Sequence, residues 1–186
     1  MDPNRNIILI GMKSSGKTTI GRLVARKLGL RFTDVDAEVE RLHGQQKGEW
    51  LRFREIFKRY GKDYFRTLET TALRSLSAAP HERPFVLATG GGLPLTEENR
   101  PLLKSLGIIV FLDVAQEVLL PRIIARGVPA FFPYPDDPAK SLAELLAARR
   151  PVYGALAEIT VGCRSESQDT IANMIINQLE NNTCED

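Results

Sequence analysis

The phosphate-loop pattern G-x-x-x-x-G-K-[ST] constrains this chain more than any other feature of its sequence. Residues 11–18 match it at all four specified positions, which are Gly11, Gly16, Lys17 and Thr18. The apolar run at 7–10 predicts a buried strand before the loop, and apolar residues at helical spacing across 20–28 predict a helix after it. This context disfavours a glycine-rich turn that matches by chance, and it indicates a nucleoside triphosphate site.

The chemistry of such a loop follows from its glycines, its lysine and its hydroxyl group. Glycines let successive N–H groups point inward, where the N-terminus of the following helix adds partial positive charge. Lys17 can reach the β- and γ-phosphates, and the Thr18 hydroxyl can ligate Mg²⁺. We therefore expect ATP and Mg²⁺ as cofactors, held by Gly11, Ser14, Ser15, Gly16, Lys17, Thr18 and Thr19.

Length and composition indicate one globular domain over residues 1–186. The chain is 43% hydrophobic and 26% charged, which excludes disorder as the default. The net charge is +2 and no block of like charge occurs, so we expect no nucleic-acid partner.

The cysteines and the apolar stretches bear on metal binding and on compartment. Cys163 and Cys184, the latter in a tail expected to fray, give no disulfide framework and no metal-ligand spacing. With only two histidines beside them, a zinc site is not expected. We find no signal peptide, and no apolar stretch approaches the ~20 residues of a membrane span. We therefore expect a cytoplasmic protein without a membrane partner.

Strands and helices alternate along the chain. Five strands are predicted, three from apolar runs at 7–10, 85–88 and 108–112 and two shorter ones at 31–34 and 159–161. The segments between them predict helices, including a short one over 37–43 that ends at a polar loop over 44–48. This alternation indicates an α/β fold with a parallel sheet and right-handed crossovers.

An acidic pair follows the second predicted strand, at the edge where open α/β sheets place their ligands. Asp34 and Asp36 are two residues apart, so on an extended segment their side chains share a face. One carboxylate could hold Mg²⁺ through water while the other meets a substrate hydroxyl. The alternative is a pair of helix N-cap acids, which are common at such a position.

Three glycines, Gly90, Gly91 and Gly92, follow the third predicted strand. A run of glycines is entropically costly, which favours a close approach of the backbone to another group over a plain loop.

Arginines are the groups that an anionic acceptor or a developing phosphoryl charge would require. The candidates are Arg66, Arg122, Arg126, Arg149 and Arg150, and spacing alone does not select among them. The irregular stretch 127–138 contains four prolines and is a candidate lid or binding loop.

Taken together, these motifs resemble the shikimate kinases. The resemblance rests on the phosphate loop, Asp34-Val35-Asp36, Phe65-Arg66 with Glu69, Gly90-Gly91-Gly92 and Arg149-Arg150-Pro151-Val152-Tyr153. It covers nearly the whole chain. It implies a three-layer P-loop kinase fold like that of nucleoside-monophosphate kinases, with a five-stranded parallel sheet in the order 2-3-1-4-5 flanked by helices. It also implies transfer of the ATP γ-phosphoryl group to the 3-hydroxyl of shikimate, in aromatic amino-acid biosynthesis, by a monomer.

The resemblance implies roles for the residues at matching positions. Lys17 and Thr18 would serve the phosphates and Mg²⁺, and Asp34 would assist the metal. Asp36 would hydrogen-bond the substrate hydroxyls and accept the proton.

The remaining implied roles concern the acceptor and the adenine. Arg66 and Arg149 would clamp the substrate carboxylate, beside a pocket lined by Gly90, Gly91 and Gly92. Arg122 and the chain near Arg164 would flank the adenine. The implied subdivision is a substrate-binding subdomain over about 36–66 and a lid over about 122–141.

The sequence departs from the family pattern in two places. The family lid carries an Arg-Pro-Leu-Leu motif whose arginine reaches both ATP and substrate, but the matching stretch here is 128–131, with Val128 in place of that arginine. Loss of such a cation costs several kcal/mol of transition-state stabilisation. Arg126 could substitute in a reshaped loop, so we predict it as catalytic with Lys17 and Asp36. The stretch between Gly44 and Ile56 is longer than in the family, which predicts an enlarged or altered pocket.

The altered lid keeps two other functions open. One is a kinase of the same fold that acts on another hydroxylated, anionic metabolite. The other is a nucleotide-binding regulatory protein with weak or no catalysis, which the intact Lys17, Thr18, Asp34 and Asp36 disfavour.

Overall fold

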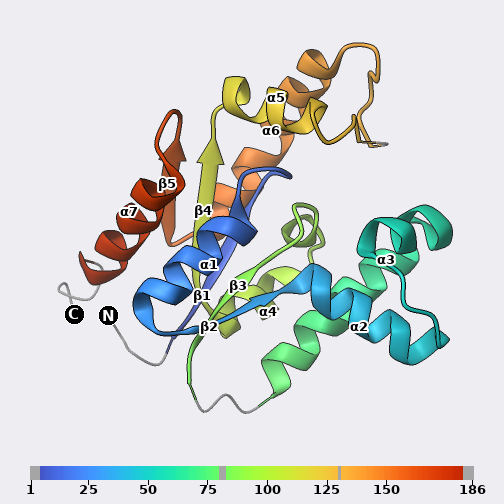
Figure 1. Ribbon diagram of the computed structural model, residues 1–186, viewed down its shortest axis with the longest axis horizontal. Coiled ribbons are helices and arrows are strands. Elements are labelled where there is room, and N and C mark those ends of the chain that lie inside the picture. Colours follow the sequence, from blue (N-terminus) through green and yellow to red (C-terminus); the bar gives the residue numbers. More distant parts are fainter. Residues whose placement is uncertain (1–4, 80–82, 130, 182–186) are drawn as a thin grey trace.

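The computed structural model describes residues 5–79, 83–129 and 131–181, and its centre is a five-stranded parallel sheet (Figure 1). The strands are β1 (Asn6–Gly11), β2 (Arg31–Asp34), β3 (Phe85–Ala88), β4 (Gly107–Val114) and β5 (Ile159–Cys163). Their order is β2-β3-β1-β4-β5, as the family resemblance implied. All adjacent pairs are parallel, so the carboxyl ends of the strands meet at one edge.

Helices connect the strands and cover both faces of the sheet. They are α1 (Lys17–Leu28), α2 (Val35–Lys47), α3 (Phe53–Ala78), α4 (Asn99–Leu106), α5 (Gln116–Ile124), α6 (Pro138–Leu156) and α7 (Gln168–Asn181), with a short 3₁₀ helix η1 (Leu93–Leu95). The α/β class predicted from the alternation of elements is confirmed.

The two faces of the sheet carry separate hydrophobic cores because side chains alternate along each strand. In β1, Ile7 and Leu9 pack into the core shared with α1 and α7. Ile8 and Ile10 pack into the core shared with α2, α3 and α4. Helices α1 and α7 lie together on the first face (Figure 1). Three layers result, with β1 buried on both sides.

The predicted loop over 44–48 is wrong, because α2 continues to Lys47. Gly44 lies inside the helix, where the ring of Trp50 covers it, and a Cβ there would lie 2.6 Å from that ring. The helix ends instead at Gly48, whose φ of 70° is in the left-handed region that glycine tolerates.

Helix α3 is bent at Gly61, which has φ 82° and ψ 176°. The part before Gly61 carries the end of the long stretch noted in the sequence, and the part after it packs on the sheet through Phe65 and Leu68. Helices α2 and α3 project from the β2 edge of the sheet (Figure 1).

Two sequence positions singled out above, Cys184 and Ala130 of the 128–131 stretch, lie outside the described residues. Within the described ranges, no helix is long and apolar enough to cross a membrane.

Candidate active site

The phosphate loop joins β1 to α1 at the carboxyl edge of the sheet, and its backbone is folded back on itself. Gly11 and Gly16 have φ of 142° and 96°, and Ser14 also has positive φ, at 66°. A Cβ at Gly11 would lie 2.8 Å from the Leu112 carbonyl oxygen, so only glycine fits there. The buried Ser14 Oγ has no hydrogen-bond partner among the residues that the structure describes. An inward-curled loop with an unpaired hydroxyl fits the oxygen-rich phosphates of a nucleotide.

Lys17 is buried at the centre of this loop. Its Nζ donates to the carbonyl oxygens of Gly11 (2.9 Å) and Met12 (2.8 Å), and it lies 3.3 Å from Ser15 Oγ. Burial lowers the pKa of Lys17 to about 8, against the opposing effects of the carboxylates of Asp36 and Asp34. A buried ammonium that has only neutral oxygens as direct partners is well suited to bind a phosphate.

Thr18 and Asp34 meet at the start of α1 and the end of β2. The Thr18 hydroxyl donates to Asp34 Oδ2 at 2.9 Å, and Asp34 Oδ1 accepts the backbone N–H of Asp36 at 3.0 Å. Asp34 is therefore the N-cap of α2, as the alternative of helix N-cap acids predicted for this position. Its bond to Thr18 also places it beside the phosphate loop. Hydroxyl and carboxylate oxygens are ligands that Mg²⁺ prefers. Among the described residues no group of three or more acidic, histidine or cysteine side chains could hold a metal ion alone.

Asp36 lies in the first turn of α2, because the strand ends at Asp34 and the helix begins at Val35. The expectation of two aspartates on one face of an extended segment is therefore wrong. The Asp36 carboxyl is half-buried, and burial raises its pKa to about 7, assisted by the nearby charges of Asp34 and Glu69 and opposed by Lys17. A carboxyl with a pKa near neutral pH is suited to accept a proton.

Arg66 and Glu69 are paired on α3 beside the glycine segment that follows β3. The Arg66 guanidinium donates to Glu69, whose side chain is 1% exposed. Burial raises the pKa of Glu69, and the Arg66 charge opposes that rise. The buried carboxylate therefore holds the guanidinium in place, while Arg66 itself remains partly exposed at the site.

The three glycines after β3 fit between these groups because they lack side chains. A Cβ at Gly90 would lie 2.6 Å from Glu69 Oε1, and one at Gly91 would lie 3.0 Å from the Lys13 backbone nitrogen. A Cβ at Gly92 would overlap the Arg66 guanidinium. The predicted close approach of backbone to other groups is confirmed, and none of the three glycines has a positive φ.

Helix α6 contributes Arg149 and Tyr153 to the same region. Arg149 Nη1 lies 3.6 Å from Met12 Sδ, and its guanidinium lies 5.1 Å from the Phe131 ring centroid. The buried Tyr153 hydroxyl donates to the Gly91 carbonyl oxygen at 2.6 Å, which ties the glycine segment to α6.

The neighbouring Arg150 points elsewhere. Its guanidinium donates to Asp113 Oδ1 at 2.8 Å and to the Val114 carbonyl oxygen at 3.3 Å, so it ties α6 to the end of β4. Of the adjacent arginines, only Arg149 contacts the phosphate loop.

The lid segment lies between α5 and α6, and in Figure 1 it stands above the phosphate loop. Arg126 is exposed in the turn after α5, and its charge lowers the pKa of Lys13 in the phosphate loop, after the larger effects of burial and of Arg54. Val128 is 40% exposed. Arg126 is thus the lid cation whose charge reaches the phosphate loop, while position 128 holds an uncharged valine.

The two arginines expected beside adenine lie on separate segments, Arg122 in the last turn of α5 and Arg164 directly after β5. Burial raises the pKa of the Cys163 thiol at the end of β5 to about 11, helped by the charges of Glu166 and Asp113, and the Arg122 charge opposes that rise. Arg164 follows β5, and its backbone N–H donates to Glu166 Oε2 at 2.6 Å. Both residues are exposed, as is Thr19 on the first turn of α1.

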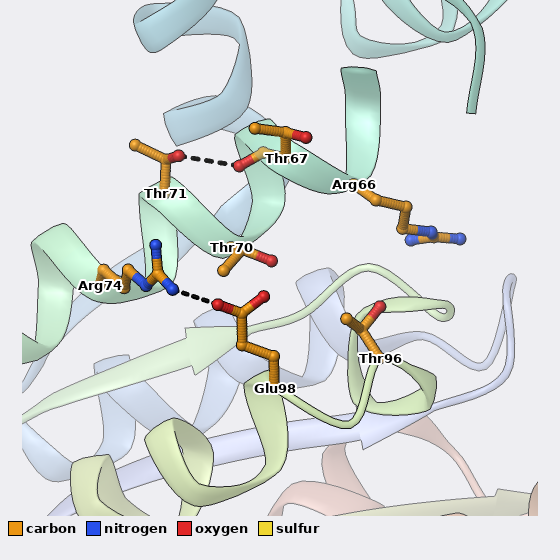
Figure 2. A pocket seen from close by; sticks show the side chains of 7 residues that line it. All are labelled: Arg66, Thr67, Thr70, Thr71, Arg74, Thr96 and Glu98. Carbon is orange, nitrogen blue, oxygen red and sulfur yellow. Dashed lines mark hydrogen bonds and ion pairs between the residues drawn. The ribbon is translucent and has the colours of Figure 1, made fainter. Parts of the chain in front are cut away.

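Beside Arg66 there is a cavity of about 200 Å³, whose lining side chains come from α3 and from the segment between η1 and α4 (Figure 2). The ion pair of Arg74 with Glu98 lies at one side of it, and the Arg66 side chain extends away from that pair. The lining is Arg66, Thr67, Thr70, Thr71, Arg74, Thr96 and Glu98.

The sequence did not single out three side chains that the structure places here. Lys13 occupies a position of the loop that the motif leaves free, and its basic character was the available signal. Phe131 and Arg54 gave no signal, because their proximity to the loop depends on the fold of the lid and of α3.

Comparisons with known proteins agree on the kind of molecule that carries this arrangement. The family model for shikimate kinase matches residues 13–180. A shikimate kinase of Neisseria gonorrhoeae is 38% identical over 174 residues, which make up 92% of this chain and 96% of that protein. One from Geobacter sulfurreducens is 36% identical over 171 residues, or 92% and 88% of the two proteins. The solved shikimate kinase from Acinetobacter baumannii in complex with shikimate has a TM-score of 0.83 and 34% identity, covering 96% of this chain and 94% of that one.

Proposed function

Because this chain belongs to the shikimate kinase family, we propose that it transfers the γ-phosphoryl group of ATP to the 3-hydroxyl of shikimate. The observation that carries the proposal is its likeness, over nearly its full length, to a solved kinase bound to shikimate. The family and the fold make it a phosphotransferase with an alcohol group as acceptor. Phosphoryl transfer needs positioning and charge neutralisation more than covalent chemistry, and the site is built from groups of that kind.

We assign the nucleotide to the phosphate loop. The Lys17 ammonium now donates to the carbonyl oxygens of Gly11 and Met12 at the centre of the loop. With nucleotide bound, it would donate to phosphate oxygens instead. Mg²⁺, when bound, would neutralise charge on the phosphates, and Thr18 and Asp34 are the residues that would hold it. The adenine is assigned to the surface between Arg122 and Arg164.

We assign shikimate to the space between α3, the three glycines and α6. Arg66 and Arg149 are the proposed partners of its carboxylate, since guanidinium groups bind carboxylates with two parallel hydrogen bonds. Asp36 would accept the proton of the reacting hydroxyl as a general base, a role to which its pKa of about 7 is suited near neutral pH. The corresponding subdivision is a substrate-binding subdomain over about 36–66 and a lid over about 122–141 in a single domain. We propose a monomer that works in the cytoplasm, where ATP is available.

A coupled assay of ADP release with and without shikimate tests the proposal. Turnover that depends on shikimate supports it, whereas turnover only with other hydroxylated acids would assign the chain to a different acceptor. Tight ATP binding without any acceptor-stimulated turnover would make it a nucleotide-binding regulator.

Removal of the central cation is the first mutational prediction. We expect Lys17→Ala to lower kcat by at least ~100-fold, because a preorganised cation at the transferring group is lost. Lys104→Ala on the exposed face of α4 is the matched control and should retain the wild-type rate. Wild-type turnover in Lys17→Ala would exclude the proposed mechanism.

The altered lid yields the second mutational prediction. We propose that Arg126 replaces the cation missing at position 128, so Arg126→Ala should lower kcat by on the order of 100-fold. Val128→Arg should change the wild-type rate less than about twofold yet restore most of the rate in the Arg126→Ala background. A large gain from Val128→Arg in the wild type would show instead that the lid lacks a functional cation.

A further inference from the structure

Lys13 is a half-buried cation that forms no ion pair with any described residue. It lies at a position of the phosphate loop that the motif leaves unspecified. Across the described ranges, no carboxylate lies within 4.0 Å of its Nζ, and burial lowers the pKa of its side chain. A charge removed from water without a partner costs free energy, which a bound anion would offset.

The position of Lys13 is fixed on two sides. Its backbone nitrogen faces Gly91, where an added Cβ would come within 3.0 Å. Its Nζ lies 5.8 Å from the centroid of the Phe131 ring in the lid, and the Arg149 guanidinium lies 5.1 Å from the same ring. Lys13 therefore stands where the phosphate loop, the acceptor-side glycines and the lid meet.

The charges around Lys13 are predominantly positive. After burial, the charges of Arg54 on α3 and Arg126 on the lid lower its pKa, and only Asp36 opposes them. The charges of Arg54 and Arg126, from two other elements, thus act on Lys13 in the same direction. A bound anion at Lys13 would offset the repulsion among these cations.

We propose that the Lys13 side chain contacts the γ-phosphoryl group of the bound triphosphate and, with Arg126, supplies the positive charge that the lid lacks at Val128. This inference rests on the proposed function only in naming the triphosphate as donor. The contact distinguishes a triphosphate from a diphosphate, since ADP has no γ-phosphoryl group to meet it. Lys13 acts from the loop itself, so its charge is in place before the lid closes.

Nucleotide affinity measured without an acceptor tests the contact independently of shikimate. Titration calorimetry with Mg²⁺ would compare ADP with a non-hydrolysable ATP analogue, in wild type, Lys13→Met, Lys13→Arg and the control Lys104→Met. We expect Lys13→Met to weaken analogue binding about tenfold while ADP affinity stays within about twofold, because one charge-assisted contact is lost. Lys13→Arg should restore most of the selectivity, and Lys104→Met should match the wild type.

Turnover provides the second readout. Lys13→Met should lower kcat with shikimate by about 100-fold, since the group acts on the charge that develops during transfer. Equal losses of ADP and analogue affinity, or no loss of either, would overturn the proposal and leave Lys13 as a structural contact of the lid with Phe131. Should Lys13→Met not fold, Lys13→Gln serves in its place, with folding checked by circular dichroism. Wild-type protein that prefers the analogue but does not turn over shikimate would refute the proposed function while the Lys13 contact stands.

Discussion

At the scale of single residues, the site holds ionisable groups whose pKa values are shifted toward neutral pH by burial. The pKa of Lys17 falls to about 8 and that of Asp36 rises to about 7. For each group, the loss of hydration on burial shifts the pKa more than the opposite charge of the other group shifts it back. Groups kept in such an unfavourable state are typical of functional sites, where stability is given up for reactivity.

Asp36 yields a prediction about stability and pH in the absence of ligands. Its pKa is near 3.9 in the unfolded chain and about 7 in the folded protein, so the folded state binds the proton more tightly. The free energy of unfolding should therefore fall as pH rises from about 4 to about 7, by at most about 1.4 kcal/mol per pH unit, and the loss is complete above that range. Lys17 titrates above this window and does not obscure it.

The measurement is urea unfolding of wild type and Asp36→Asn at pH 4.5, 6 and 8. Asp36→Asn should match the wild type at low pH and exceed its free energy of unfolding at pH 8 by roughly 1–3 kcal/mol. Asp63→Asn, at an exposed position of α3, is the control and should show no such widening gap. A gap that is constant with pH would contradict the assignment of the shift to Asp36.

At the scale of elements, the bend in α3 sets the shape of the acceptor side. Gly61 has φ 82° and ψ 176°, a conformation that is essentially restricted to glycine. The bend separates the part of α3 that carries Arg54 from the part that carries Arg66 and Glu69. The two parts of the helix therefore run in different directions.

We expect Gly61→Ala to lower the free energy of unfolding by about 1–3 kcal/mol, since a Cβ strains that conformation. It should also raise KM for shikimate while leaving ADP affinity nearly unchanged. Gly154→Ala is the matched control, because Gly154 lies exposed in helix α6 with nothing within 4 Å of an added Cβ. That change should raise the free energy of unfolding by up to about 1 kcal/mol. Equal effects of the two substitutions would show that the bend has no special role.

The elements differ in how far the sequence determines them. The strand at 31–34 was predicted with its observed bounds, because its residues lie between turn signals and need no distant partner to be recognised. The end of α2 was missed, because Gly44 reads as a helix breaker in sequence. Its tolerance depends on the ring of Trp50 that covers it, and that contact exists only in the folded chain.

At the scale of the whole molecule, the sheet order explains why residues distant in sequence form one site. Because β1 lies between β3 and β4, the phosphate loop, the three glycines after β3 and the N-terminus of α2 after β2 share one edge. The loop and the glycine run could be identified from sequence, since each is a local pattern with one physical reason. Residue spacing could not choose Arg149 over Arg150, a choice that only the family resemblance implied, because it depends on which way each side chain of α6 points in the folded chain.

The same arrangement predicts how ligands stabilise the molecule. Nucleotide would bind the folded chain only, because its site draws on the phosphate loop, the end of β2 and the lid together. At 100 times the dissociation constant, ADP with Mg²⁺ should raise the free energy of unfolding by about 2.7 kcal/mol, with a corresponding rise in Tm. The rise should be nearly absent in Lys17→Met, whose loop lacks the central cation, and unchanged in Lys104→Met.

Shikimate extends this test to the acceptor side. If α3 and the lid close on the acceptor only after the phosphates have placed Lys17 and Arg126, shikimate should stabilise the nucleotide-bound protein more than the free protein. Shikimate raises the free energy of unfolding by one amount in the free protein and by another in the nucleotide-bound protein. The difference between these two increases is the coupling free energy between the sites, and it must be the same whichever ligand is added first. Differential scanning fluorimetry with each ligand alone and with both measures it. Strictly additive shifts would mean that the two halves of the site bind independently, and that closure is driven by neither ligand.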